Sequence, residues 1–149
     1  MTISNHHKSI ATFIHLSTFS RFIIPFGNFI GPIVLWMTNK DKSEFIDKHG
    51  KQAINFQISI LIYAIVIGTL SVPFFIFKLF KELQFIDFNG FYNFEVNLTE
   101  PSPLFYIGGG LGAIAVIAFI IEIAFIIKAS LSARDGKDYH YPLCINFLK

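Results

Sequence analysis

Two long apolar stretches dominate the pattern of hydrophobic and polar positions along the chain. Residues 52–77 contain no charged side chain, and residues 101–121 contain none either. A helix needs about 20 residues to cross a bilayer core of about 30 Å. The two stretches therefore predict transmembrane helices, over about 52–78 and about 104–130.

A third apolar region, residues 9–39, is interrupted. Arg21 lies near its middle, and two prolines and two glycines follow it closely. One straight span would hold Arg21 near the bilayer centre at a cost of at least ~2.5 kcal/mol. It would also place the prolines inside a helix, where they remove hydrogen bonds. We therefore prefer a helical hairpin over about 9–38, formed by two short helices that meet at a turn over 24–28. One kinked span is the alternative.

Basic residues are distributed unevenly among the segments that flank the apolar stretches. Eight basic residues lie after the hairpin or near and beyond the end of the last helix: Lys40, Lys42, Lys48, Lys51, Lys128, Arg134, Lys137 and Lys149. Only Lys78 and Lys81 lie between the two long helices. Basic residues favour the cytoplasmic side of a membrane. We therefore expect an interfacial segment over 39–51, a tail over 131–149 and both termini in the cytoplasm.

The segment between the long helices, residues 79–103, is expected outside the membrane and is rich in aromatic residues. An Asn-Gly pair at 89–90 lies between two aromatic runs, which is a strong signal for a small β-hairpin. An isolated hairpin is marginally stable in water, so these side chains need a surface. That surface is either the membrane interface or a partner protein. The aromatic residues of this candidate partner-binding loop are Phe85, Phe88, Phe91, Tyr92 and Phe94.

Composition narrows the class of protein further. The chain has 149 residues, of which 53% are apolar and 15% are charged, with a net charge of +2. Soluble domains carry about 25% charged residues, and a net charge of +2 neutralises few phosphates of a nucleic acid. The single Cys144 allows no intramolecular disulfide. We therefore expect one all-α integral membrane domain over 1–149 that does not bind nucleic acid.

Two charged residues, Arg21 and Glu122, lie within apolar sequence. An acid inside a membrane is a candidate for proton or ion transfer. Glu122 is also close in sequence to Lys128, so hydration or pairing near the interface is the simpler interpretation.

Small and polar residues suggest two sites of helix packing. Gly108 and Gly112 form a small-xxx-small pair that allows close approach of another helix. Packing within the chain is preferred over homodimerisation. Four polar residues near the hairpin and the first long helix are interpreted as a polar clamp: Asn28, His49, Asn55 and Gln57. Separate hydration of each at the interface is the alternative.

No motif of catalysis, cofactor binding or metal binding is recognisable. His15 has no second histidine at i+3 or i+4, and no cluster of cysteines or carboxylates accompanies it. We expect His15 to be a hydrogen-bonded packing residue. We expect no cofactor and no metal, and we do not expect an enzyme.

Three runs of sequence, over 24–32, 45–58 and 136–147, resemble a family of small bacterial membrane proteins. That family is similar to the import subunit of the chloroplast inner envelope, the Tic-twenty-like group. The resemblance implies a compact domain of four helical segments with cytoplasmic ends. It implies no known reaction.

These observations predict a non-enzymatic accessory subunit of a larger complex in the bacterial inner membrane. By resemblance, that complex is one of protein translocation or secretion. The alternative is a small oligomeric channel or transporter component, in which the intramembrane polar residues line a path. Homo-oligomers are compatible with both.

The hairpin makes a testable prediction about topology. A reporter that is active only in the cytoplasm, fused before Met1, is expected to be active, because the hairpin returns the chain to the side on which it began. The same reporter at Lys149 is the control. A reporter that is active only outside would support one kinked span.

Overall fold

The computed structural model describes residues 3–83 and 103–149, and the described residues are helical or irregular with no strand. The expectation of an all-α protein is thus confirmed for this part of the chain. The predicted β-hairpin and the aromatic residues between Phe85 and Phe94 lie outside the described residues. The described chain forms two units, residues 1–62 with 120–149 and residues 63–119.

The N-terminal apolar region folds as two helices and not as one continuous helix. Helix α1 (Asn5–Leu16) begins at Ser4, whose hydroxyl accepts a hydrogen bond from the His7 amide at 3.2 Å. It continues into a 3-10 helix, η1 (Ser17–Phe22), and a turn leads to α2 (Gly27–Met37). Ser20 secures this turn, because its hydroxyl donates to the Gly27 carbonyl at 2.6 Å.

The turn depends on a glycine. Phe26 has a left-handed backbone with φ of 58°, and Gly27 follows it directly. A Cβ atom on Gly27 would lie 2.4 Å from the backbone of Ser20. The close approach of α2 to η1 therefore requires glycine at this position.

After a short 3-10 helix, η2 (Lys40–Lys42), helix α3 runs without a break from Glu44 to Leu83. The sequence predicted an interfacial segment over 39–51 and a long helix from about residue 52. In the structure Gly50 lies inside α3, where a Cβ atom would be 2.1 Å from the Trp36 ring. Trp36 also donates to the Asp47 carboxylate at 2.8 Å. Gly50 therefore provides room for an aromatic residue of α2.

Helix α4 (Pro103–Arg134) ends in a glycine-based cap. Gly136 has φ of 75°, its amide donates to Ala133, and the Lys137 amide donates to Ser132. These two hydrogen bonds form a Schellman motif, which ends the helix and redirects the chain into the tail.

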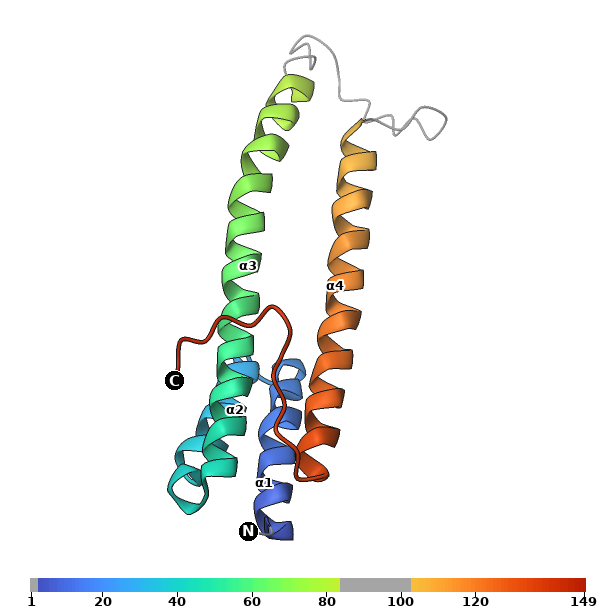
Figure 1. Cartoon of the computed structure of the whole chain (residues 1–149). Coiled ribbons are helices and arrows are strands. Elements are labelled where there is room, and N and C mark those ends of the chain that lie inside the picture. Colours follow the sequence, from blue (N-terminus) through green and yellow to red (C-terminus); the bar gives the residue numbers. More distant parts are fainter. Residues whose placement is uncertain (1–2, 84–102) are drawn as a thin grey trace. The chain divides into compact units, whose positions relative to one another are not determined.

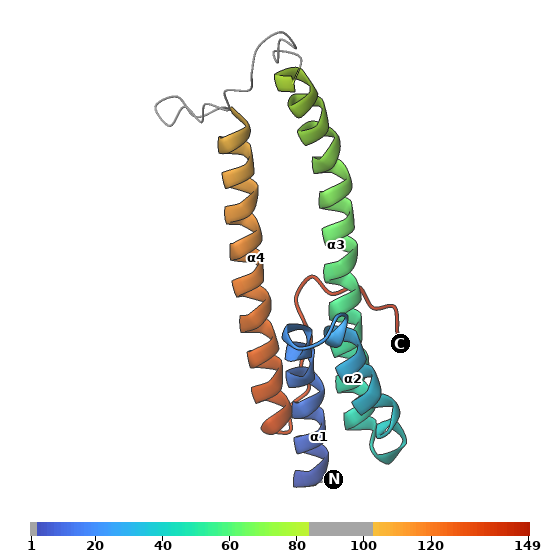
Figure 2. The same cartoon turned by 180° about the vertical axis from the view of Figure 1, so that it is seen from behind.

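Three small apolar clusters hold the first unit together. They join α1, α3, α4 and the tail, with Ile14 on Ile46 and Ala53, Ala11 on Phe45 and Ala133, and Phe56 on Ile126, Ala129 and Tyr141. Figures 1 and 2 show the short helices and the tail gathered around the start of α3 and the end of α4. The tail brings Tyr141 onto Phe56, with ring centroids 3.9 Å apart.

Two helices are long and apolar enough to cross a membrane: Glu44–Pro73, with mean hydropathy 1.9, and Gly108–Arg134, with mean hydropathy 2.7. In the most apolar part of the second, only 11% of the residues are buried. Large apolar side chains such as Leu70, Ile114 and Val116 are more than half exposed. Water would not favour such continuous apolar surface, so these helices fit a lipid environment. The two predicted long apolar helices are thus confirmed.

The contact between Trp36 and Gly50 makes a testable prediction. Gly50→Ala is expected to lower the free energy of unfolding by about 1–3 kcal/mol, because the added methyl group overlaps the partly buried Trp36 ring. Thermal unfolding in a mild detergent would measure the change. Gly112→Ala is the matched control, because no described atom lies within 4 Å of its added Cβ. An equal loss in both variants would contradict this explanation.

Candidate functional site

The central polar feature of the first unit is an ion pair between Arg21 and Glu122. Arg21, in the last turn of η1, donates from Nη1 to Glu122 Oε2 at 3.1 Å, and its Nη2 atom donates to Oε1. The two side chains are 24% and 9% exposed. The paired contact is the fork geometry that makes arginine–carboxylate pairs strong and directional. It joins the hairpin to α4.

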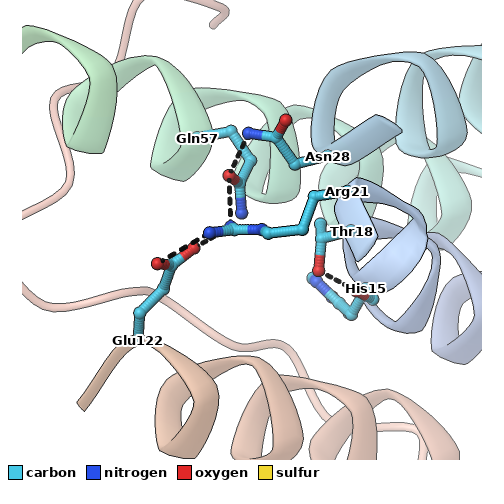
Figure 3. Close-up of polar contacts among 6 residues, drawn as sticks. All are labelled: His15, Thr18, Arg21, Asn28, Gln57 and Glu122. Carbon is cyan, nitrogen blue, oxygen red and sulfur yellow. Dashed lines mark hydrogen bonds and ion pairs between the residues drawn. The ribbon is translucent and has the colours of Figure 1, made fainter. Parts of the chain in front are cut away.

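Gln57 extends this ion pair to two further helices. Its Oε1 atom accepts from Arg21 Nη2 at 3.2 Å and from Asn28 Nδ2 at 2.9 Å. Figure 3 shows the four side chains converging from η1, α2, α3 and α4. We call Arg21, Asn28, Gln57 and Glu122 the polar hub. Because its members come from four elements, it fixes their mutual positions.

One donor of the polar hub is left over. The Gln57 Nε2 atom is buried and has no hydrogen-bond partner among the described residues. Rotating the amide by 180° would not help, since its oxygen is needed by both Arg21 and Asn28. A buried amide without a partner costs about 1–3 kcal/mol, so this donor lowers the net stability that the hub contributes.

A second polar feature is a chain of three hydrogen-bonded rings. Tyr141 Oη lies 2.9 Å from His15 Nδ1, and His15 Nε2 lies 2.8 Å from His49 Nδ1. All three residues are at most 5% exposed. Burial raises the pKa of the Tyr141 hydroxyl well above its usual value, so it stays protonated and can donate. We call these residues the ring chain. It joins the tail, α1 and α3.

The tail is also fastened by backbone hydrogen bonds to two side chains of α3. Asn55 accepts from the Leu148 amide and donates to its carbonyl, both at 2.9 Å. Ser59 Oγ accepts from the Ile145 amide at 2.8 Å. Two polar residues inside α3 are thus satisfied by an irregular tail segment.

Only two of the four residues of the predicted polar clamp form a hydrogen bond with each other. Asn28 and Gln57 do bond to each other, but His49 bonds to His15 and Asn55 bonds to the tail. His15 is a hydrogen-bonded packing residue, with partners in α3 (His49) and in the tail (Tyr141). The sequence analysis missed Tyr141 and Ser59, because nothing in the sequence places the tail against α3.

The remaining predicted site residues lie outside these clusters. Added Cβ atoms at Gly109, Gly110 and Gly112 would meet no described atom within 4 Å, so within the described residues the glycine run shows no close packing at these three positions. Cys144 is partly buried, and burial raises the pKa of its thiol, which disfavours the reactive thiolate.

The comparisons with known proteins supply a family. A model of the MamF/MmsF family, described as the magnetosome magnetite crystal formation protein family, matches residues 6–148. The chain belongs to this family. No curated protein and no solved structure matches the chain.

The assignment to the Tic-twenty-like group is therefore wrong. All three runs that suggested it fall within residues 6–148, the region matched by the magnetosome family. Glycines and amides near the ends of membrane helices serve close packing and hydrogen bonding. Such residues therefore indicate how helices pack and do not by themselves identify a protein family. The expected link to protein translocation or secretion loses its support with this correction.

The polar hub predicts how substitutions at Glu122 act. Glu122→Gln is expected to lower the free energy of unfolding, because it leaves Arg21 without its counter-charge in a poorly hydrated place. The loss should exceed the ~1 kcal/mol of an exposed pair and stay within the about 3–5 kcal/mol of a fully buried one. Thermal unfolding in lipid nanodiscs would measure it.

A double variant provides the control. Arg21→Met with Glu122→Met removes both charges, and apolar replacement of a buried pair is often neutral, so most of the lost stability should return. Full stability in Glu122→Gln alone would contradict a structural ion pair and favour a role in proton or ion transfer.

Proposed function

We propose that this protein is a non-enzymatic membrane component of the magnetosome that takes part in forming magnetite crystals. The observation that carries the proposal is the family match, which covers residues 6–148 of 149. The two long apolar helices support a position in a membrane. A bacterial inner-membrane origin, with both termini in the cytoplasm, is part of the proposal and rests on the distribution of basic residues.

The polar hub supports a structural role more than a chemical one. Arg21 and Glu122 neutralise each other, and Gln57 and Asn28 complete the set. Groups that transfer a proton or an ion must change partners during the reaction, whereas these groups already have theirs. We therefore propose that the first unit acts as a rigid base within the membrane. The same reasoning gives the channel or transporter hypothesis no specific support.

A larger membrane assembly is the setting that we propose for this base. Apolar side chains remain exposed along both long helices, including Ile65 and Leu70 on α3 and Ile117 and Ile120 on α4. Lipid tails can cover such apolar surfaces, and other membrane helices can cover them equally well. The chain thus offers surface for partners without exposing polar backbone.

The proposal predicts a phenotype for loss of the gene in its own magnetosome-forming host. Cells without the protein should produce magnetite crystals with an altered size or shape, measured by electron microscopy. The intact gene, reintroduced, should restore the crystals. Normal crystals in cells shown to lack the protein would contradict the proposal.

Variants of the polar hub separate a structural role from a chemical one in the same cells. Complementation by the double variant Arg21→Met with Glu122→Met should succeed to the extent that the protein accumulates in the membrane. Failure of a variant that accumulates normally would show that the charges themselves are needed.

A further inference from the structure

The two limbs of the N-terminal hairpin change from polar to apolar side chains at the same level. Among the described residues up to Ser9, and again from Thr38 to Lys42, the exposed side chains are polar. Ile10 of α1 and Trp36 of α2 pack against the same apolar cluster, so the two changes lie close together in the fold. From residue 10 to residue 37, every exposed side chain is apolar.

The turn between η1 and α2 carries the most exposed of these large apolar side chains. Ile23 is 84% exposed and Phe26 is 75% exposed. Figure 2 shows this turn at one end of the hairpin and the N-terminus at the other. Water disfavours such a concentration of exposed apolar surface, whereas the acyl chains of lipid can cover it. The hairpin therefore has a polar end and an apolar end.

Polar side chains within the apolar stretch find their partners inside the protein. Ser17 and Thr18 donate to backbone carbonyls of the preceding turn, both at 2.7 Å. Ser20 donates to the backbone of α2, and Arg21 and Asn28 belong to the polar hub. Hydrocarbon offers polar groups no partners, so these internal bonds suit a position in lipid.

The backbone of the turn is likewise suited to lipid. The Ile23 and Ile24 amides both donate to the Ser20 carbonyl at 3.0 Å. The Gly27 amide donates to the Ile24 carbonyl at 3.1 Å, and Pro25 has no amide to satisfy. Irregular backbone within a membrane needs such partners, because the bilayer core holds no water.

The polar hub sets the depth of the turn. On α3, Gln57 comes six residues after Lys51. On α4, Glu122 comes six residues before Lys128. At about 1.5 Å per residue, each hub residue is about 9 Å from the last charged residue at that end of its helix, and half of a bilayer core is about 15 Å. Since Arg21 directly precedes the turn and joins the hub, the turn lies near the middle of the core.

The length of α2 gives the same limit. This limb has 11 residues, which span about 16 Å, whereas the core of a bilayer is about 30 Å thick. Lys40 and Lys42 follow the limb and belong with the polar headgroups. A limb of this length carries the turn about half-way across the core and cannot bring it to the opposite surface.

We infer that the hairpin is a re-entrant membrane element, which enters and leaves the bilayer at the same surface and inserts its turn among acyl chains near the middle of the core. The apolar turn thus contacts the lipid hydrocarbon of one leaflet. The ion pair of Arg21 with Glu122 and the hydrogen bond of Asn28 to Gln57 hold the turn at that depth. The inference rests on the membrane position of the two long helices and not on a role in magnetite formation.

The chain has a single tryptophan, Trp36, so fluorescence can report the depth of a chosen position. In a Trp36→Phe background, Ile23→Trp places the fluorophore in the turn. Met37→Trp, at another exposed position, places it at the polar end of α2 as the matched control. The full-length proteins are reconstituted in phosphatidylcholine vesicles brominated near either the headgroup or the methyl end of the acyl chains. The Ile23→Trp protein is expected to lose more fluorescence to the deep bromines, and the Met37→Trp protein more to the shallow ones.

Two other results would overturn the inference. Stronger quenching of the Ile23→Trp protein by the shallow bromines, or by iodide in the water, would place the turn at a membrane surface. Quenching by neither the lipid nor the water-soluble quencher would show that protein, such as a second copy of the chain, covers the turn.

Cysteine labelling provides a second measurement that leaves Trp36 in place. In a Cys144→Ala background, Ile24→Cys and Lys42→Cys are compared in intact cells and in inverted membrane vesicles, with a maleimide that cannot cross the membrane. Lys42→Cys is expected to react in only one of the two preparations, and Ile24→Cys in neither until detergent is added. Reaction of Ile24→Cys before detergent, on either side, contradicts the inference, and reaction on the side opposite to Lys42→Cys identifies a hairpin that spans the bilayer.

Discussion

The first unit depends on an ion pair that brings a guanidinium group and a carboxylate together in an apolar setting. Either charge alone, that of Arg21 or that of Glu122, would be costly there, because a single charge in a poorly hydrated place lacks a counter-charge. Together they satisfy each other, and Gln57 Oε1 accepts hydrogen bonds from both Arg21 and Asn28. These contacts therefore hold η1, α2, α3 and α4 together at one place (Figure 3).

A polar contact has particular value in this environment. Lipid tails are as apolar as leucine, so burial of apolar surface gives membrane helices little reason to choose one neighbour over another. The apolar clusters of the first unit are small, and alanine is a member of each of them. The directional hydrogen bonds of the polar hub and the ring chain therefore specify the arrangement, while close contacts at Gly27 and Gly50 permit it.

The sequence predicted the kinds of element better than their connections. Runs without charge indicated the two long helices, and the prolines and glycines after Arg21 indicated a hairpin in place of one span. Arg21 and Glu122 were both identified as exceptional, yet their pairing was not predicted, because 101 residues separate them and Glu122 was expected to be hydrated or paired near the interface. His15 and His49 were also not predicted as a pair, because 34 residues separate them and no local spacing links them. The boundary predicted at residue 51 was wrong, because α3 continues through Gly50, whose small size leaves room for the Trp36 ring.

We conclude that the polar hub makes η1, α2 and the end of α4 one cooperative unit. Hydrogen exchange measured by mass spectrometry in lipid nanodiscs tests this directly, by comparing the natural protein with Glu122→Gln. The account predicts that amides in η1, α2 and the part of α4 around residue 122 exchange faster together in the variant, because the hub is lost as a whole. Faster exchange confined to the turn of α4 that carries residue 122, with α2 unchanged, would contradict it.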